Sequence, residues 1–192
     1  MISKKLIQSL KNGSVLVVGD IMLDRYIEGN ITRISPEAPI PILNKQNERY
    51  MLGGAGNVVA NLRSFNVSVS LVGIVGDDDS STEITTMLKN INVNSNLVSV
   101  RNSHSTTKTR FTSKQHQVFR FDVDLKLSRD KQIIEKVRAI IDGYNVILLS
   151  DYGKGVISDT TASQIIRLAN KKERKFLLIQ KEKTIKNMMA PI

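Results

Sequence analysis

The sequence predicts an α/β fold in which helices cover both faces of a largely parallel β-sheet. Short apolar runs that end in glycine or a polar turn recur along the chain, as in 15–18 and 146–149. Such runs are typical of strands buried in a parallel sheet. Segments with apolar residues at helical spacing separate them, as in 129–142. This alternation of strand and helix favours a parallel sheet with helices on both sides.

Composition limits the class of protein. The 192 residues suffice for one domain with a substantial core. The sequence has no cysteine, no apolar run of about 18 residues and no signal-peptide pattern, so we expect no disulfide, no membrane partner and a cytoplasmic location. The formal charge is +10, and the excess lies from Arg101 onward. An anionic substrate or a solvated basic surface explains it better than nucleic acid, because aromatic residues for base stacking are few.

The first predicted strand leads into two aspartates. A short amphipathic helix is expected over 3–12, and the strand 15–18 then runs into Gly19 and Asp20, with Asp24 close behind. Ligands of open α/β sheets bind at the carboxyl ends of the strands. Asp20 and Asp24 are therefore candidates to accept hydrogen bonds from ligand hydroxyls, although a turn or helix-cap role fits them equally well.

Residues 26–51 depart from this scheme. They alternate between apolar and polar side chains and contain Pro36, Pro39 and Pro41. Because proline keeps strands at sheet edges, we expect a small projecting β-flap here. Such a flap would serve as a lid that excludes water, or as a subunit contact.

A glycine pair opens the next predicted helix, over about 54–65. Gly53 and Gly54 allow a ligand to approach the backbone closely, and Asn57 follows in the first turn. Free N–H groups at a helix start favour anions and polar oxygens. The stretch is thus a candidate cradle for a small molecule, and its alternative is a tight loop before a packing helix.

The middle of the chain contains a predicted strand at 67–76 and a helix at 80–90. Asp77, Asp78 and Asp79 precede this helix. Because they are consecutive, they match a helix cap better than a metal-binding loop. The two histidines lack metal-ligand spacing, so they are expected at the surface.

Three further strands are predicted, and they carry basic residues. The strands are expected at 94–100, 106–112 and 117–122. Lys108 and Arg110 share one face of a regular strand, and Arg120 follows on the next strand. Together they favour a phosphate or carboxylate ligand, although polar outward positions of an edge sheet match the same pattern.

The last clear pattern is a strand at 146–149, a helix at 158–170 and a strand at 175–180. The polar loop 150–155 follows the first of these strands and contains Lys154. A lysine at the carboxyl end of a parallel strand is well placed to meet an anion.

Four motifs occur in order along the chain. They are Gly19-Asp20-x-Met22-Leu23-Asp24-Arg25-Tyr26, Arg33-Ile34-Ser35-Pro36-Glu37-Ala38-Pro39-x-Pro41, Gly53-Gly54-Ala55-x-Asn57-Val58 and Ser150-Asp151-Tyr152-Gly153-Lys154-Gly155. From about residue 14 to about residue 179, the sequence resembles the ribokinase/phosphofructokinase-B carbohydrate kinases. Within them it is most similar to the D-glycero-β-D-manno-heptose 7-phosphate kinase domain of a bifunctional kinase–adenylyltransferase of ADP-heptose synthesis, part of lipopolysaccharide core synthesis. The Arg33–Pro41 motif is the most specific of the four.

The resemblance implies a ribokinase-like three-layer fold with a small β-sheet lid, about 26–51 plus part of 105–122, which often forms a homodimer interface. It implies transfer of the γ-phosphoryl group of ATP, with Mg²⁺, to the anomeric hydroxyl of the sugar. It also assigns residues to the sugar-phosphate substrate. These are Asp20, Asp24, Arg33, Gly53, Gly54, Asn57, Lys108, Arg110, Arg120 and Lys154.

The resemblance covers only the first part of the family pattern. The family's late Gly-rich segment, which ends in the general-base aspartate, is expected beyond the C-terminus, so no catalytic or metal-binding residue is assigned in this chain. After Ile179 the family has an Asp-Pro-Lys turn, whereas this chain continues Gln180-Lys181-Glu182 and diverges over 180–192, as a frameshift would produce. We therefore expect one incomplete domain over 1–192. It is either the N-terminal part of a kinase or an inactive remnant that binds sugar phosphate or dimerises.

Overall fold

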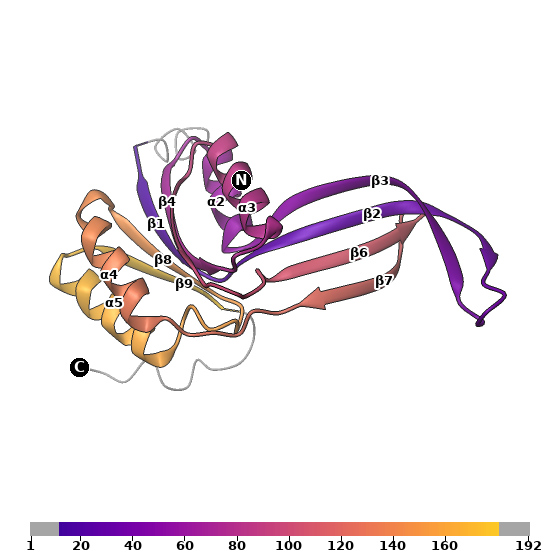
Figure 1. Cartoon of the computed structure of the whole chain (residues 1–192). Coiled ribbons are helices and arrows are strands. Elements are labelled where there is room, and N and C mark those ends of the chain that lie inside the picture. Colours follow the sequence, from indigo (N-terminus) through magenta and orange to yellow (C-terminus); the bar gives the residue numbers. More distant parts are fainter. Residues whose placement is uncertain (1–11, 181–192) are drawn as a thin grey trace.

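The computed structural model of the protein describes residues 12–180. Of the helix expected over 3–12 and the divergent tail expected over 180–192, only residue 12 and Gln180 lie within this range. The chain forms a core of helices and strands, and a long second sheet projects from this core (Figure 1). The elements, in chain order, are β1 (Ser14–Gly19), β2 (Ile21–Ile34), β3 (Pro41–Gly54), α2 (Ala55–Ser64), β4 (Ser68–Val75), α3 (Asp79–Asn90), β5 (Asn94–Ser99), β6 (Thr107–Ser113), β7 (His116–Val123), α4 (Asp130–Ile140), the short 3₁₀ helix η1 (Ile141–Gly143), β8 (Val146–Asp151), α5 (Asp159–Lys171) and β9 (Lys175–Gln180).

The core sheet is parallel. Within residues 12–180 its strand order is β5-β4-β1-β8-β9, and every neighbouring pair runs parallel. The central strands β1 and β8 are buried on both faces, which explains their continuous apolar runs. Parallel pairing brings the carboxyl ends of these strands to one edge of the sheet, beside the junction of β1 and β2.

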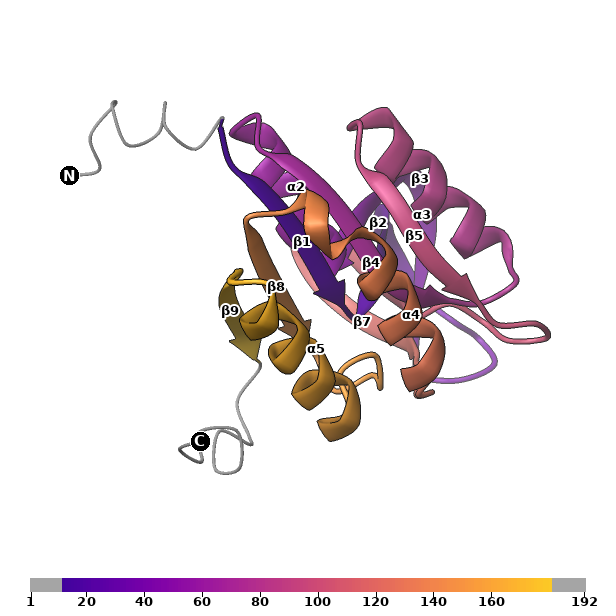
Figure 2. The same cartoon turned by 90° about the vertical axis from the view of Figure 1, so that its left-hand side faces the viewer.

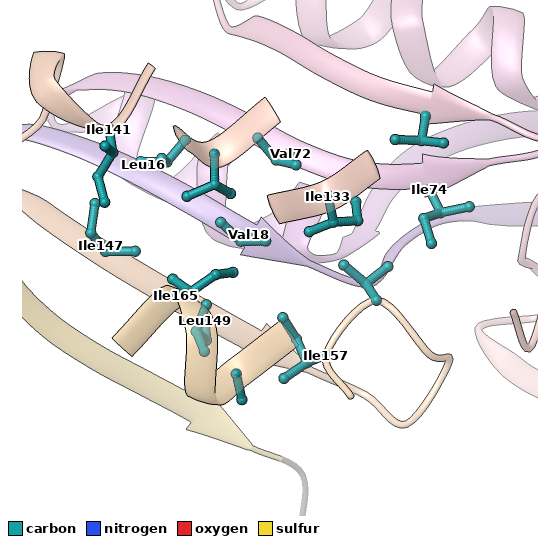
Figure 3. Close-up of a cluster of buried hydrophobic side chains, with 14 of the residues drawn as sticks. Leu16, Val18, Val72, Ile74, Ile133, Ile141, Ile147, Leu149, Ile157 and Ile165 are labelled. Atoms are coloured by element: carbon teal, nitrogen blue, oxygen red, sulfur yellow. The ribbon is translucent and has the colours of Figure 1, made fainter. Parts of the chain in front are cut away.

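Helices cover both faces of the core sheet, as the sequence predicts. On one face, α2 and α3 bury Val59, Ile84 and Leu88 against β1 and β4. On the other face, α4 and α5 bury Ile133 and Ile165 among side chains of β1, β4 and β8 (Figures 2 and 3). Full burial of an aliphatic side chain of this size contributes about 1.5–3 kcal/mol. The three-layer α/β fold is confirmed.

The second sheet, which we call the lid sheet, has the order β3-β2-β6-β7 within residues 12–180. It projects from the core (Figure 1). β2 pairs antiparallel with β3 and parallel with β6. The sheet begins at Ile21, earlier than the flap expected from residue 26, because β2 follows β1 almost without a break.

A two-residue turn joins β6 to β7. Lys114 and Gln115 both have positive φ, 48° and 69°. This is the backbone conformation that a type I′ hairpin turn requires. The turn and a one-residue shift in pairing after Phe111 together set the register, in which Arg110 lies opposite Arg120.

Candidate functional site

One face of the lid sheet carries charged side chains from adjacent strands. Strand register places Asp24 beside Lys108, and Lys108 beside Asp122. Two residues further out, Tyr26 lies beside Arg110, and Arg110 beside Arg120. Residues two apart along a strand share a face, so both rows lie on the same side. We call this surface the charged lid face; its members are Asp24, Tyr26, Lys108, Arg110, Arg120 and Asp122.

Each expected cation of this face has an acidic partner. Arg110 Nη1 lies 3.0 Å from Asp24 Oδ1. Lys108 Nζ and Arg120 Nε each lie 3.0 Å from an oxygen of Asp122. The structure therefore brings Lys108, Arg110 and Arg120 together, as the sequence predicts, but with opposite charges between them. Burial opposes ionisation of Asp122, and its bonds to Lys108 and Arg120 outweigh this, so that its pKa lies below the ordinary value.

The Asp24–Arg110 pair is the most enclosed part of the charged lid face. The two side chains are 18% and 23% exposed. Burial raises the pKa of Asp24, against the lowering influence of Arg110 and Lys108. Although Asp24 Oδ1 and Arg110 Nη1 are close enough for an ion pair, neither buried atom has a hydrogen-bond partner among the described residues. A buried polar atom without a partner costs about 1–3 kcal/mol, and a ligand hydroxyl that donates to Asp24 or accepts from Arg110 would offset this cost.

The glycine pair lies directly behind Asp24. A Cβ on Gly53 would lie 2.6 Å from Asp24 Oδ2, and one on Gly54 would lie 2.3 Å from the carbonyl oxygen of Asp20. Gly54 also has φ of +56° and is the N-cap of α2. Close approach and backbone conformation therefore both require glycine here. Asn57 is exposed in the first turn of α2, and its Oδ1 accepts a hydrogen bond from Asn61 at 3.4 Å.

Asp20 and Asp24 occupy different environments. Asp24 lies inside β2, not just past the end of the first strand as the sequence suggested. Asp20 lies at the β1–β2 junction and is 1% exposed. Its carboxylate accepts hydrogen bonds from the backbone N–H groups of Tyr152, Lys154 and Val156, at 2.8, 3.0 and 3.1 Å. Both carboxylate oxygens of Asp20 are therefore engaged within the fold. Burial raises its pKa despite the three donors.

Lys154 lies where the lid sheet joins the core. Its Nζ lies 2.6 Å from Asp124 Oδ1, immediately after β7. The hydrogen bond from Lys154 lowers the pKa of Asp124, and the charge of Lys108 also contributes. Lys154 therefore adjoins the charged lid face, as expected for a lysine in the loop after β8.

Arg33 is not brought to this place. It lies near the outer end of β2, exposed and in register with Ile42. Nine residues of extended strand separate it from Asp24, a distance of about 30 Å. Within one copy of the chain, Arg33 is therefore remote from the Asp24–Arg110 pair.

Sequence reasoning did not single out several residues of the site. The guanidinium carbon of Arg49 lies 3.9 Å from the ring centroid of Tyr26, and that of Arg110 lies 5.5 Å from the same centroid. Asp122 and Asp124 alternate with Arg120, so the period-two argument used for Lys108 and Arg110 would have found them. Arg49 gives no such signal, because only the β2–β3 register places it beside Tyr26.

Comparison with known proteins identifies the family. A model described as "pfkB family carbohydrate kinase" matches residues 12–191. The chain belongs to the pfkB family of carbohydrate kinases. The resemblance inferred from its motifs is thus confirmed.

Curated relatives share the name Bifunctional protein HldE. The one from Aliarcobacter butzleri is 39% identical over 178 residues, which are 90% of this chain and 37% of the relative. The one from Campylobacter fetus is 40% identical over 173 residues, 88% of this chain and 38% of the relative. The chain therefore spans less than two-fifths of the length of these relatives.

Solved structures confirm the ribokinase-like fold. Arabidopsis thaliana ribokinase complexed with ribose and ATP matches with a TM-score of 0.62 and 19% identity, over 86% of this chain and 53% of the ribokinase chain. Phosphofructokinase-2 from Escherichia coli in complex with fructose-6-phosphate matches with a TM-score of 0.67 and 18% identity, over 89% and 56% of the two chains. At these identities the likeness concerns the fold alone.

Residues 12–180 contain neither a membrane-spanning helix nor a metal-binding cluster. No helix in this range is long and apolar enough to cross a membrane. In the same range, no three histidine or acidic side chains cluster in a way that would hold a metal ion. The aspartates at 77–79 belong to a helix cap instead: the side chain of Asp78 accepts a hydrogen bond from Ser81 N–H at 3.0 Å.

Proposed function

We propose that this chain is the sugar-phosphate-binding part of an ATP-dependent kinase that acts in the cytoplasm on the anomeric hydroxyl of D-glycero-D-manno-heptose 7-phosphate. The observation that carries the proposal is the Asp24–Arg110 pair. The pair is largely buried, Asp24 Oδ1 and Arg110 Nη1 lack hydrogen-bond partners among the described residues, and further cations lie beside it. Relatives named HldE support a kinase of this branch. The choice of heptose 7-phosphate rests on the motif resemblance described above.

The residues divide by chemistry into two groups. Asp24, with the backbone at Gly53 and Gly54 and the amide of Asn57, suits sugar hydroxyls. The cationic side chains suit the phosphate already on the substrate, because charge-assisted hydrogen bonds to phosphate are the strong ones. They are Lys108, Arg110, Arg120 and Lys154.

ATP would supply the transferred phosphoryl group, and ribokinase solved with ATP supports its use in this fold. The described residues do not fit a magnesium site of their own, since no suitable acidic cluster occurs within 12–180. We therefore assign this chain binding and orientation of the sugar, and derive no step through the metal.

A second candidate function is binding without catalysis. The carboxylates of the charged lid face and its base, Asp24, Asp122 and Asp124, are each paired with a cation. The pKa values of Asp122 and Asp124 lie below the ordinary value, which makes both weak general bases. Burial raises the pKa of Asp24, but its carboxylate is engaged by Arg110. Within residues 12–180, the site thus offers no free base to activate a sugar hydroxyl.

Calorimetry separates these possibilities. The purified chain is titrated with heptose 7-phosphate, with the unphosphorylated heptose and with an ATP analogue, and ADP release is assayed in parallel. Binding that requires the phosphate supports the proposal, and ADP release distinguishes a kinase from a binding protein. Arg110→Met should weaken heptose 7-phosphate binding about 10–100-fold, the equivalent of losing a charged hydrogen bond. Arg138→Met, an exposed arginine of α4, is the matched control. Absence of heptose 7-phosphate binding would refute the assignment.

A further inference from the structure

The loop after β8 is wrapped around one buried side chain. Asp20 Oδ2 accepts hydrogen bonds from the N–H groups of Tyr152 and Lys154, and Oδ1 accepts one from Val156. The backbone N–H of Asp20 in turn donates to the carbonyl of Ser150 at 3.1 Å. The aspartate and the loop are about 130 positions apart in the sequence, yet they form one hydrogen-bonded unit.

The conformation of the loop follows from this arrangement. The donors are alternate residues, so the backbone must curl for their N–H groups to converge. Gly153 and Gly155 supply the curl, with φ of +68° and +104°, which glycine adopts without strain. Convergent backbone N–H groups of this kind form an anion-binding concavity. Here the anion is the protein's own carboxylate.

Lys154 is held at several points as a result. Its N–H donates to Asp20, its carbonyl accepts from Leu127 N–H at 3.2 Å, and its Nζ meets Asp124. Leu127 also packs against Gly155, where a Cβ would lie 2.8 Å from the Leu127 carbonyl oxygen. The loop is therefore clamped between Asp20 inside the core and the segment that leaves the lid sheet. A lysine ordered in advance loses less conformational entropy when it binds an anion.

We propose that Asp20 is a positioning residue, which holds the 151–156 loop so that Lys154 stays beside the charged lid face, and which does not contact the substrate itself. The motif resemblance assigns Asp20 to the binding site. In this proposal, Asp20 belongs to the site because it positions Lys154. The ligand part of this inference rests on the proposed function, because it takes a sugar phosphate as the anion that Lys154 meets. The loop part rests on the contacts of Asp20 alone.

Hydrogen exchange followed by NMR tests the loop part without any ligand. Asp20→Asn replaces one acceptor oxygen with an NH₂ group, which cannot accept a hydrogen bond from the loop. The loop amides that face the NH₂ group, either Val156 or the pair Tyr152 and Lys154, should lose at least tenfold in protection, while those of β1 and β8 keep theirs. Asp142→Asn, at an exposed aspartate bonded to Lys172, is the matched control. Unchanged protection of the loop amides in Asp20→Asn would overturn the proposal.

Gly153→Ala covers the case in which Asp20→Asn fails to fold. Nothing lies within 4 Å of a Cβ at Gly153, so the substitution strains only the φ of +68° and leaves the core untouched. It should loosen the same loop amides. Retention of their protection in this variant would also count against the clamp.

A double-mutant cycle tests the ligand part with heptose 7-phosphate as the probe. Asp20→Asn and Lys154→Met should each weaken binding about tenfold, and the double variant should bind no worse than Lys154→Met alone. If the loss of binding in the double variant equals the product of the two single losses, Asp20 acts on the ligand independently of Lys154, and the proposal is overturned. If the unaltered chain binds no heptose 7-phosphate, the proposed function fails, whereas the exchange data still decide whether Asp20 holds the loop.

Discussion

At the scale of single residues, Gly53 shows how closely backbone and side chain approach each other at the candidate site. The space that a Cβ would need is taken by Asp24 Oδ2 and by the Met22 side chain, at 2.6 and 2.7 Å. Asp24 is in turn fixed by Arg110. Any side chain at position 53 must therefore displace the carboxylate that we assign to the sugar.

Gly53→Ala should consequently impair ligand binding without changing any charge. We expect heptose 7-phosphate to bind at least tenfold more weakly, because Asp24 is pushed out of line with Arg110. Gly143→Ala is the matched control, since a Cβ there meets nothing within 4 Å. Calorimetry on both variants gives the comparison, and circular dichroism checks that both are folded. Equal affinity of Gly53→Ala and the unaltered chain would argue against Asp24 as a sugar ligand.

At the scale of elements, the lid sheet contains a polar cluster on the face opposite the charged lid face. Glu48 of β3 bonds Lys45, Arg25 and Tyr50, the last through the Tyr50 hydroxyl at 2.7 Å. These bonds from Lys45, Arg25 and Tyr50 lower the pKa of Glu48 from 4.5 to about 2. The cluster ties β2 to β3 near the base of the lid sheet.

The lowered pKa of Glu48 predicts acid sensitivity. A carboxyl whose pKa is lower in the folded state stabilises the fold fully above its unfolded pKa, here 4.5. This stability is lost as the pH falls toward about 2. Glu48→Gln should remove about 1 kcal/mol of it at neutral pH, since the cations of the cluster are partly exposed. Urea unfolding across this pH range should show a smaller acid loss for Glu48→Gln than for the unaltered chain. Glu135→Gln on α4 serves as control, and parallel pH profiles for Glu48→Gln and the unaltered chain would contradict the prediction.

The same opposite face of the lid sheet carries exposed aromatic residues. The rings of Phe111 and Phe119 lie 5.8 Å apart. Phe119 is 58% exposed and Phe121 is 54% exposed. Exposed apolar side chains gathered on one surface mark an interaction site, which supports the expected homodimer through the lid.

If the lid forms a homodimer through these aromatic residues, removing them should give a monomer. We expect Phe119→Ser combined with Phe121→Ser to raise the dimer dissociation constant at least tenfold, because about 1.4 kcal/mol of lost apolar burial suffices for that change. Light scattering after size exclusion measures the mass. Phe65→Ser, at an exposed phenylalanine after α2, should leave the mass unchanged. A monomer at all concentrations of the unaltered chain would show that this face does not pair.

At the scale of the whole molecule, local patterns predicted the layers but not the long-range contacts. The shared face of Lys108 and Arg110 could be predicted because strand periodicity is local. The position of Arg120 opposite Arg110 depends on the two-residue turn at Lys114 and Gln115 and on a one-residue shift in pairing after Phe111. No local pattern links Asp20 to amides more than 130 positions away. Arg33 belongs to a readable motif, yet the unbroken length of β2 carries it away from Asp24.

The core sheet of the described residues ends in a strand with one uncovered face. β9 pairs with β8, and its Phe176 and Leu178 pack in the cluster under α4 and α5. The alternate residues Leu177 and Ile179 are 55% and 42% exposed. Leu177 lies in register with Leu148, which belongs to the buried cluster on the other face. Apolar side chains at the end of a sheet favour self-association, because they and the edge backbone can bind another chain.

Replacing Leu177 and Ile179 with polar residues should reduce self-association of the chain in solution. Leu177→Thr combined with Ile179→Thr keeps residues that favour strands while it removes the exposed aliphatic surface. We expect binding of a hydrophobic dye such as ANS to fall at least twofold, and the concentration at which the chain aggregates to rise. The melting temperature should change little, because both side chains are largely outside the core. Val118→Thr on the lid sheet, at a residue with similar exposure, separates a general loss of apolar surface from an effect of this edge. If the Val118→Thr control lowers dye binding as much, or the double variant does not lower it, then β9 is not the site of association.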